Sequence, residues 1–450
     1  MPRPHQKQVV AIVIAILVFF GFVHFVTNSS PGTLTDQAVV YVDTQTNQII
    51  ENFDVSKIQG VKVASENKVQ ESIKDAAKEE LVGNQQISQP KEESKSPEKA
   101  EDQSAVKAEQ AEKPGKQLAN NEVATGERVK ATFVTLARNS ELYELIKSIR
   151  RVEDRFNRKF NYDWVFLNDE PFTQEFKDLT TAIVSGKTKY GLIPKEHWSY
   201  PDFIDQNKAA ESRENMKAQR IIYGDSESYR HMCRFESGFF WQNPLLDEYD
   251  WYWRVEPGIQ IHCDLDYDLF KFMQDNNKLY GFTISIYEFE ATIPTLWKHT
   301  KDFLKLHPDY IAENNLLDFI SNDRGETYNL CHFWSNFEVG NLNFWRSKQY
   351  REYFDYLDKT GGFFYERWGD APVHSLAAAL FLNRDQIHYF EDVGYNHGVY
   401  TQCPLNAQFR YDHKCHCNPD TDFTFRGYSC GKRYYDVMNM KKPAEWEHYT

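Results

Sequence analysis

Residues 131–184 read ATFVTLARNSELYELIKSIRRVEDRFNRKFNYDWVFLNDEPFTQEFKDLTTAIV. The β-rich apolar runs at 131–137 and 163–167 predict two short strands. Between them apolar residues recur at helical spacing, which predicts a helix with Ser140 as its cap, and residues 173–184 fit a second helix. This order of strand, helix, strand and helix is typical of a parallel α/β sheet.

Ligands of parallel α/β sheets bind where the strands end at their carboxyl side. Arg138 directly follows the first predicted strand. We therefore expect Arg138 at the mouth of a nucleotide site, with a plain loop position as the alternative. GxGxxG, Walker A and GxSxG motifs are missing from the sequence. Dehydrogenases, P-loop kinases and α/β-hydrolases are accordingly disfavoured.

A third strand is predicted within Tyr249–Gly258, which reads YDWYWRVEPG, and this strand pattern ends at the proline. Strand alternation would place Tyr252, Arg254 and Glu256 on one face. A carboxylate at the end of a central strand is well placed to hold Mn²⁺ or Mg²⁺, which prefer oxygen ligands. The alternative for Glu256 is an ion pair with Arg254 and no metal.

A second acidic run lies at residues 263–268, CDLDYD. It is either another candidate metal site or a solvated loop. Three further segments, 224–230, 332–338 and 365–374, combine carboxylates with aromatic residues. Aromatic faces pack against pyranose rings and desolvation tunes a nearby acid, so these segments suit sugar chemistry. The same composition is also common on surfaces without any catalytic role.

The N-terminal third of the chain differs from the rest. Residues 9–26 are apolar except for His24 and long enough to span a bilayer, whereas a cleavable signal peptide would have a shorter apolar region. Basic residues precede the run, so we expect a single-pass type II anchor with the remainder in the lumen. Residues 54–132 lack Phe, Trp and Tyr, which predicts an unfolded or partly helical stem rather than a coiled coil.

These observations divide the chain into a cytoplasmic tail at 1–8, an anchor at 9–26, a stem at 27–129 and a globular domain at 130–450. Of the 68 aromatic residues, 62 lie from residue 131 onward. The net charge of −14 argues against a nucleic-acid partner, which would normally select a basic surface. All seven cysteines lie beyond residue 230, and their odd number leaves at least one thiol unpaired within the chain.

Five strings together resemble the fungal α-1,2-mannosyltransferases of Golgi mannan synthesis. They are YWRVEP, GDSESYRHMCRFESGFF, NLCHFWSNFEVGN, GGFFYERWGDAPVHSLAAALFL and HYFEDVGYNH, and they occur in the family's order across residues 130–450. The resemblance implies a GT-A-like nucleotide-sugar fold with a mixed central sheet flanked by helices. It also implies a Golgi membrane location, a GDP-mannose donor, Mn²⁺, and a mannosylated glycoprotein or oligosaccharide acceptor in O- or N-glycosylation of cell-wall mannan.

The resemblance also implies roles for individual residues. Glu256 and His397 would ligate the metal. Glu338 would be the nucleophile of a retaining transfer, or the group that stabilises an oxocarbenium ion, by the two-carboxylate logic of retaining enzymes. The residues expected around donor and acceptor are Arg138, Tyr229, Arg254 and Asp370.

One departure from the family pattern concerns the metal. The family usually carries a second acid in a Glu-Pro-Asp turn, and Gly258 stands there in this chain. If that acid binds metal, this chain should bind metal more weakly. If it only shapes the turn, glycine is tolerated because it adopts most backbone conformations.

In a lumenal protein, Cys403, Cys415, Cys417 and Cys430 are expected to form disulfides that staple the C-terminal loops, with open connectivity. A zinc site from Cys403, His413, Cys415 and Cys417 is the less favoured alternative, because CxC is a poor match to zinc spacing. Two rival functions stay open within the same fold: a lumenal mannosylphosphate transferase and a non-catalytic mannan-binding protein.

Overall fold

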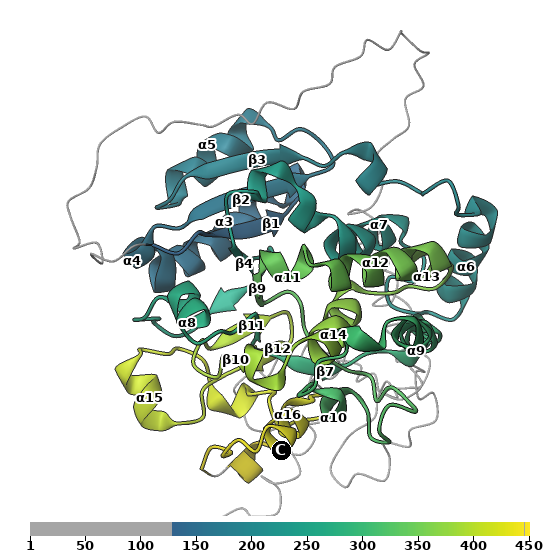
Figure 1. Cartoon of the computed structure of the whole chain (residues 1–450). Helices are drawn as coiled ribbons and strands as arrows, with labels where there is room; N and C mark the ends of the chain where they lie inside the picture. The colour runs from purple at the N-terminus through teal and green to yellow at the C-terminus, as the bar shows by residue number, and fades with distance from the viewer. Residues whose placement is uncertain (1–127, 445) are drawn as a thin grey trace, which may run out of the picture. The chain divides into compact units, whose positions relative to one another are not determined.

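The computed structural model describes residues 128–444 and 446–450. Its main feature is a seven-stranded sheet with the strand order β10-β6-β9-β4-β1-β2-β3. Strands β1, β2 and β3 lie next to one another at the top of Figure 1. Neighbouring strands pair in parallel except at β9, which is antiparallel to both β4 and β6. The sheet is thus mixed, as expected. Its strands are β1 (Ala131–Leu136), β2 (Asp163–Asn168), β3 (Thr188–Leu192), β4 (Trp251–Arg254), β6 (Tyr280–Phe282), β9 (Glu338–Asn341) and β10 (Ile387–Tyr389).

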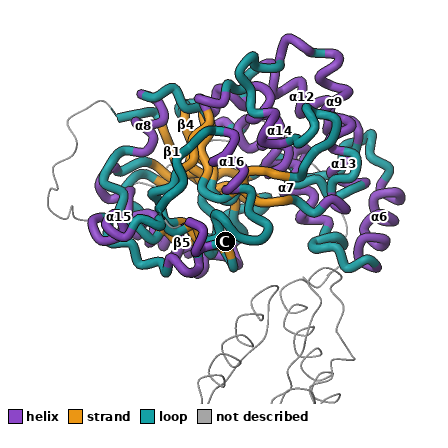
Figure 2. The backbone as a smooth tube through the Cα atoms, turned by 90° about the horizontal axis from the view of Figure 1, so that it is seen from below, coloured by secondary structure: helices purple, strands orange, loops and turns teal. Residues whose placement is uncertain are grey.

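Both faces of this sheet are buried, because successive side chains of a strand point to opposite faces. In β2, Trp164 and Phe166 belong to one apolar cluster, whereas Val165 and Leu167 belong to the other. Strands buried on both faces read as continuous apolar runs, which explains the sequence of the predicted strands. Figure 2 shows the strands in the middle with helices on either side.

Helices cover both faces. The face lined by Trp164 is packed by residues of α3, α5 and α8, and the opposite face by residues of α7, α9, α12 and α14. The helices longer than four residues are α3 (Leu142–Val152), α5 (Gln174–Ile183), α6 (Gln206–Ala218), α7 (Glu227–Gly238), α8 (Leu269–Asp275), α9 (Leu296–Leu306), α12 (Lys348–Thr360), α14 (Asp370–Phe381), α15 (Ala407–Asp412) and α16 (Gly431–Val437). The shorter ones are α4 (Arg158–Phe160), α10 (Leu317–Ile320), α11 (Leu342–Trp345) and α13 (Gly362–Tyr365).

Two small sheets complete the fold. One has the order β12-β11-β5, and the other pairs β7 with β8. Their strands are β5 (Gln260–Ile261), β7 (Ser285–Tyr287), β8 (Cys331–Phe333), β11 (Tyr395–His397) and β12 (Tyr400–Gln402). Because β11 pairs antiparallel with β5, His397 is carried close to the segment that follows β4.

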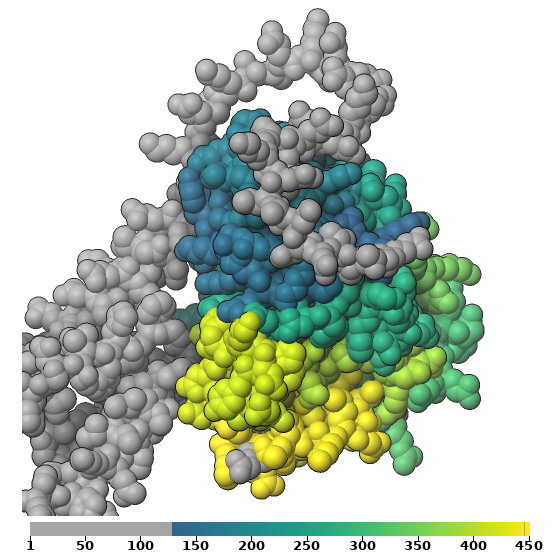
Figure 3. Space-filling model, turned by 90° about the vertical axis from the view of Figure 1, so that its left-hand side faces the viewer, coloured from purple at the N-terminus to yellow at the C-terminus, as the bar shows by residue number. Residues whose placement is uncertain are grey.

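Three disulfides fix the C-terminal segment, which is yellow-green to yellow in Figure 3: two join it to earlier parts of the chain and one closes a loop within it. They are Cys263–Cys415, Cys331–Cys430 and Cys403–Cys417, and Cys233 is a buried free thiol. The predicted disulfides are therefore confirmed. The alternative zinc site was wrong, because the thiols it required are consumed in disulfides.

Several local predictions are confirmed and two are corrected. Strands β1 and β2 and helix α5 lie where the sequence predicted them. Ser140 does not cap α3. Instead residues Asn139–Glu141 form a 3-10 turn, and the Glu141 carboxylate accepts the backbone N–H of Arg138 at 2.7 Å. Strand β4 ends at Arg254, so Glu256 lies beyond the strand. Pro257 lacks an N–H for a sheet ladder, which agrees with this early end.

The predicted membrane anchor at residues 9–26 lies outside the described residues. Within residues 128–444 and 446–450, no helix has the length and apolar character needed to cross a membrane.

Candidate active site

The predicted site residues meet at one edge of the large sheet. Arg138 lies two residues beyond β1 and Glu256 two residues beyond β4, and these two strands are parallel. Strand β9 runs the other way, so its first residue, Glu338, is paired with Arg254, the last residue of β4. The sheet topology therefore brings the ends of β1 and β4 and the start of β9 to the same edge, as expected for α/β sheets.

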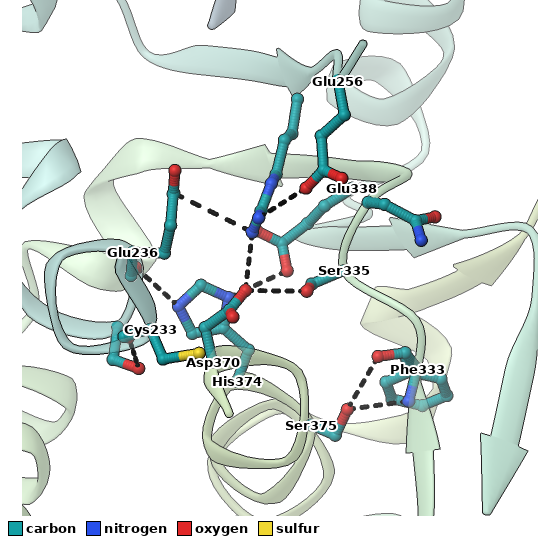
Figure 4. A network of polar contacts seen from close by, with 12 residues as sticks. Cys233, Glu236, Glu256, Phe333, Ser335, Glu338, Asp370, His374 and Ser375 are labelled. Carbon is teal, nitrogen blue, oxygen red and sulfur yellow. Dashed lines mark hydrogen bonds and ion pairs between the residues drawn. The ribbon is translucent and has the colours of Figure 1, made fainter. Parts of the chain in front are cut away.

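Arg254 is the centre of a buried ion-pair network. Its guanidinium donates to Asp370 Oδ2 at 2.6 Å and lies 2.6 Å from Glu256 Oε1 and 3.8 Å from Glu236 Oε2. Figure 4 shows these three carboxylates converging from separate segments. Asp370 also accepts a hydrogen bond from Ser335 at 2.7 Å. The open alternative of an Arg254–Glu256 ion pair is thus present in the structure.

Asp370 owes its position to α14. It is the first residue of that helix, where a carboxylate is favoured by the helix dipole. Burial alone would raise the pKa of Asp370, but Arg254, His374 and Ser335 lower it overall. Asp370 is therefore ionised at neutral pH.

Glu236 behaves differently from Asp370. It is buried on α7, and burial raises its pKa to about 7 against the attraction of Arg254. Near neutral pH, Arg254 thus faces the ionised Asp370, with Glu236 titrating and Glu256 Oε1 2.6 Å away. Three carboxyl groups around one guanidinium disfavour an anionic diphosphate until a cation is present.

Glu338 is fully buried, and both of its carboxylate oxygens are occupied. Tyr252 donates its hydroxyl to Oε1, and Tyr280 donates to Oε2 at 2.8 Å. His374 Nδ1 lies 2.9 Å from the same Oε2, while His374 Nε2 lies 3.1 Å from the carbonyl oxygen of Glu236. Both nitrogens of His374 face acceptors, so His374 is an imidazolium. Burial lowers its pKa, but the Glu338 carboxylate raises it further, with a net increase.

The two proposed metal ligands lie on adjacent segments. His397 ends β11, and a β-carbon at Gly258 would lie 3.9 Å from His397 Nε2. Gly258 is two residues from Glu256 and has a φ of +86°, a conformation that favours glycine. Nε2 therefore faces the turn that carries Glu256. Only Oε1 of Glu256 is held by Arg254, and the Glu256 side chain is 25% exposed.

This donor set fits Mn²⁺. Carboxylate and imidazole are both accepted ligands of Mn²⁺, and the negative charge around Arg254 favours a cation. Among the described residues, no three His, Cys, Asp or Glu side chains form a metal-holding group. Glu256 and His397 would be the residues of this chain that hold the ion.

Arg138 and Tyr229 form a second part of the site, reached through α7. Arg138 is exposed and its guanidinium donates to the hydroxyl of Ser228, which precedes Tyr229 on that helix. The Tyr229 ring stacks on the exposed Tyr223 with centroids 4.5 Å apart, and the Arg367 guanidinium lies 5.2 Å from its centroid. Arg138 thus joins the start of α7 to the end of β1.

The acidic run at 263–268 has structural partners instead. Asp264 pairs with Arg155, Asp266 with Lys159, and Asp268 caps α8 while accepting the hydroxyl of Tyr162. Each carboxylate therefore has a cation or a hydrogen-bond donor as its partner, and within the described residues the run belongs to no group of three or more metal-binding side chains.

Sequence reasoning missed several members of the site. They are Glu236, Ser335, Asn336, His374 and Tyr280. Four of them lie inside the quoted strings RFESG, WSNFE and APVHS, but no spacing distinguishes them from neighbouring polar residues. Most of their partners are distant in the chain, for example His374 and Glu338, which are 36 residues apart, so only the fold identifies them.

Comparisons with known proteins agree with this geometry. The family described as glycolipid 2-alpha-mannosyltransferase matches residues 78–439. Glycolipid 2-alpha-mannosyltransferase 2 of Candida albicans is 80% identical over 323 residues, which are 72% of this chain and 70% of that protein. Alpha-1,2 mannosyltransferase KTR1 of Saccharomyces cerevisiae is 63% identical over 325 residues, 72% of this chain and 83% of that protein.

Two crystal structures are similar over the same part of the chain. Core-mannan synthase A (CmsA/Ktr4) of Aspergillus fumigatus, in its Mn/GDP form, has a TM-score of 0.66 and 43% identity over 71% of this chain and 88% of that chain. The mannosyltransferase Ktr4p of S. cerevisiae in complex with GDP has a TM-score of 0.67 and 39% identity over 72% and 86%. The GT-A-like glycosyltransferase fold with a mixed sheet is thereby confirmed, and the chain belongs to the glycolipid 2-alpha-mannosyltransferase family.

Proposed function

We propose that this chain is a retaining α-1,2-mannosyltransferase that transfers mannose from GDP-mannose to a mannosyl acceptor in protein O- or N-glycosylation. The observation that carries the proposal is the turn after β4, which holds Glu256 and in which a β-carbon at Gly258 would lie 3.9 Å from the His397 ring, at the edge of the sheet where ligands of α/β folds bind. Relatives named α-1,2-mannosyltransferases, and solved relatives holding GDP or Mn with GDP, support the donor and the cofactor.

Glu256 and His397 would hold Mn²⁺. When bound, that ion supplies charge neutralisation for the leaving diphosphate. Arg254 lies 2.6 Å from one oxygen of Glu256, and the Glu256 side chain is 25% exposed and thus accessible to an ion. Asp370 in turn holds Arg254, and Arg138 and Tyr229, linked through α7, are the proposed contacts to donor and acceptor.

For Glu338 we propose charge stabilisation rather than nucleophilic attack. A nucleophile must reach the anomeric carbon, but Glu338 is fully buried beneath three donors. A fixed carboxylate at this depth acts over a short, poorly screened distance on positive charge that develops at the sugar. This favours the oxocarbenium-stabilising role among the two that the resemblance allowed.

We also propose that the catalytic domain, residues 130–450, lies in the lumen of the Golgi, attached by an anchor at 9–26 and a stem at 27–129. Three disulfides support an oxidising compartment. A tag on the N-terminus should be digested by protease added to sealed microsomes, while the C-terminal domain is protected. Protection of the N-terminal tag would reject this topology.

The test of function uses the full chain in detergent with GDP-mannose, Mn²⁺ and methyl α-mannoside. An α-1,2-linked disaccharide, identified by NMR and abolished by EDTA, is the expected product. A product that carries phosphate would instead identify a mannosylphosphate transferase. Tight mannan binding without turnover would identify a non-catalytic member.

A further inference from the structure

The imidazole ring of His397 contacts the side chain of Asn336. Asn336 lies just before β9, is 5% exposed, and has its side-chain nitrogen Nδ2 2.9 Å from His397 Nδ1. The hydroxyl of Tyr395 lies 2.9 Å from Asn336 Oδ1 and 3.1 Å from the backbone oxygen of Asn336. Tyr395 is itself fully buried. The contact to His397 is therefore held by a packed tyrosine from the same small sheet.

A neutral imidazole binds a metal through only one nitrogen, because the other carries the proton. The nitrogen that faces the turn with Gly258 and Glu256 is Nε2. Nε2 can serve as a ligand only if the proton resides on Nδ1. Nδ1–H in turn requires a hydrogen-bond acceptor at the position of the Asn336 amide.

The orientation of an Asn amide is an assignment, because oxygen and nitrogen have nearly the same shape. With the amide nitrogen toward the ring, Nδ1 would accept and Nε2 would hold the proton. With the amide rotated by half a turn, Oδ1 accepts Nδ1–H and the amide nitrogen donates to the Tyr395 hydroxyl. That hydroxyl then donates its single proton to the Asn336 carbonyl, which can only accept.

In the rotated arrangement, each of these polar groups has a hydrogen-bond partner. This arrangement pairs the Asn336 carbonyl, the Tyr395 hydroxyl, the amide and Nδ1 in one continuous chain. The alternative leaves the contact between Tyr395 and the carbonyl of Asn336 unused, and buried polar groups are normally paired. Tyr395 thus selects the amide orientation, and the amide selects the tautomer of His397.

We propose that Asn336, oriented by Tyr395, is a positioning residue that fixes His397 as the Nδ1–H tautomer and so presents Nε2 to a divalent cation. The inference rests on the proposed role of His397 as a ligand. It adds a hydrogen-bond partner behind the ligand, and such partners orient metal-bound imidazoles and raise their basicity.

The first test measures Mn²⁺ affinity of the full chain in detergent without any nucleotide, by electron paramagnetic resonance of free Mn²⁺. Asn336→Leu removes the acceptor and should weaken binding about 10–100-fold, the usual effect of losing such a partner. Asn336→Asp keeps an acceptor and should bind Mn²⁺ as the wild type does. Equal losses in both variants, or a wild-type affinity for Asn336→Leu, would overturn the proposal.

The second test does not depend on metal. Nitrogen NMR of the metal-free protein, labelled at histidine nitrogens, distinguishes Nδ1–H from Nε2–H, with the His397 signals identified by their loss in His397→Gln. An Nδ1–H signal that shifts toward Nε2–H in Tyr395→Phe is expected. A wild-type Nε2–H tautomer would refute the inference. Failure of the wild type to bind Mn²⁺ would instead refute the proposed cofactor, and the two failures are distinguishable.

Discussion

Arg254 and Glu338 are paired residues on neighbouring antiparallel strands, yet each uses different charged partners. Arg254 binds Asp370 and Glu256, whereas Glu338 is enclosed by His374 and two tyrosines. One edge of the sheet thus holds a network around Arg254, in which only the Glu256 side chain is partly exposed, beside the fully buried pair of Glu338 and His374. Substitutions in the network around Arg254 and in the pair of Glu338 and His374 should therefore have different effects on activity and stability.

Replacement of Glu338 by Gln should reduce turnover roughly 100–1,000-fold with little change in GDP affinity, because a fixed transition-state charge is lost. It should also destabilise the fold by roughly 3 kcal/mol, since His374 remains buried without its partner. Turnover, GDP calorimetry and thermal unfolding measure the three effects.

The matched control is Glu153→Gln. Glu153 is equally buried but receives its hydrogen bonds from Asn157, Trp164 and the backbone of Ser185. This variant should lose stability and keep its turnover per folded molecule. A large loss of GDP affinity in Glu338→Gln would place Glu338 in donor binding instead.

Glu256→Ala should abolish metal-dependent donor binding while the protein stays folded. Arg254 keeps Asp370 as its partner, and Glu256 is partly exposed, so the loss of stability should be near 1 kcal/mol or less. Calorimetric titration with GDP in the presence and absence of Mn²⁺ measures the effect. Asp266→Asn, a carboxylate paired with Lys159, is the control and should bind as the wild type. Persistent Mn²⁺-stimulated GDP binding in Glu256→Ala would remove Glu256 from the metal site.

Gly258→Asp should increase Mn²⁺ affinity. A β-carbon there lies 3.9 Å from His397 Nε2, so the added carboxylate reaches the proposed ion. Gly258→Asn has the same shape without the charge and should not tighten binding. Both variants bear the backbone cost of a positive φ, for which Asn and Asp are the better tolerated non-glycine residues. Equal affinities of the two variants would show that the position only shapes the turn.

Because of Glu236, the free energy of unfolding should fall as the pH rises. Its pKa in the folded protein is about 7, raised by burial from an ordinary value of 4.5. The folded state thus holds the proton more tightly than the unfolded state between these values, and the penalty is fully present above pH 7. Its size is roughly 3 kcal/mol, and the attraction to Arg254 is already included in the raised pKa.

Glu236→Gln should remove this pH dependence. Its stability relative to the wild type, from urea unfolding at several pH values, should rise between pH 5 and 7 and level off above pH 7. Glu248→Gln, a mostly exposed carboxylate beside Lys189, should leave the profile unchanged. A relative stability of Glu236→Gln that falls as pH rises would show that the charged Glu236 stabilises Arg254.

The local sequence was sufficient for the elements that carry the site. Strands β1 and β2 and helix α5 were predicted because β-rich apolar runs and helical apolar spacing are encoded within a few residues. Long aromatic strings also identified the family. The cap of α3 was mispredicted because a 3-10 turn, rather than the Ser140 hydroxyl, begins that region.

Tertiary structure alone decided which side chains of the site contact one another. The disulfide Cys263–Cys415 joins residues 152 apart, and connectivity among several cysteines cannot be deduced from sequence. The contacts of Arg254 with Asp370, and of Asn336 with His397, likewise join distant segments. Periodicity and capping are properties of a few neighbouring residues, so the sequence determined the elements and their order. Ion pairs, tautomers and burial depend on which elements pack together, so only the folded chain determined them.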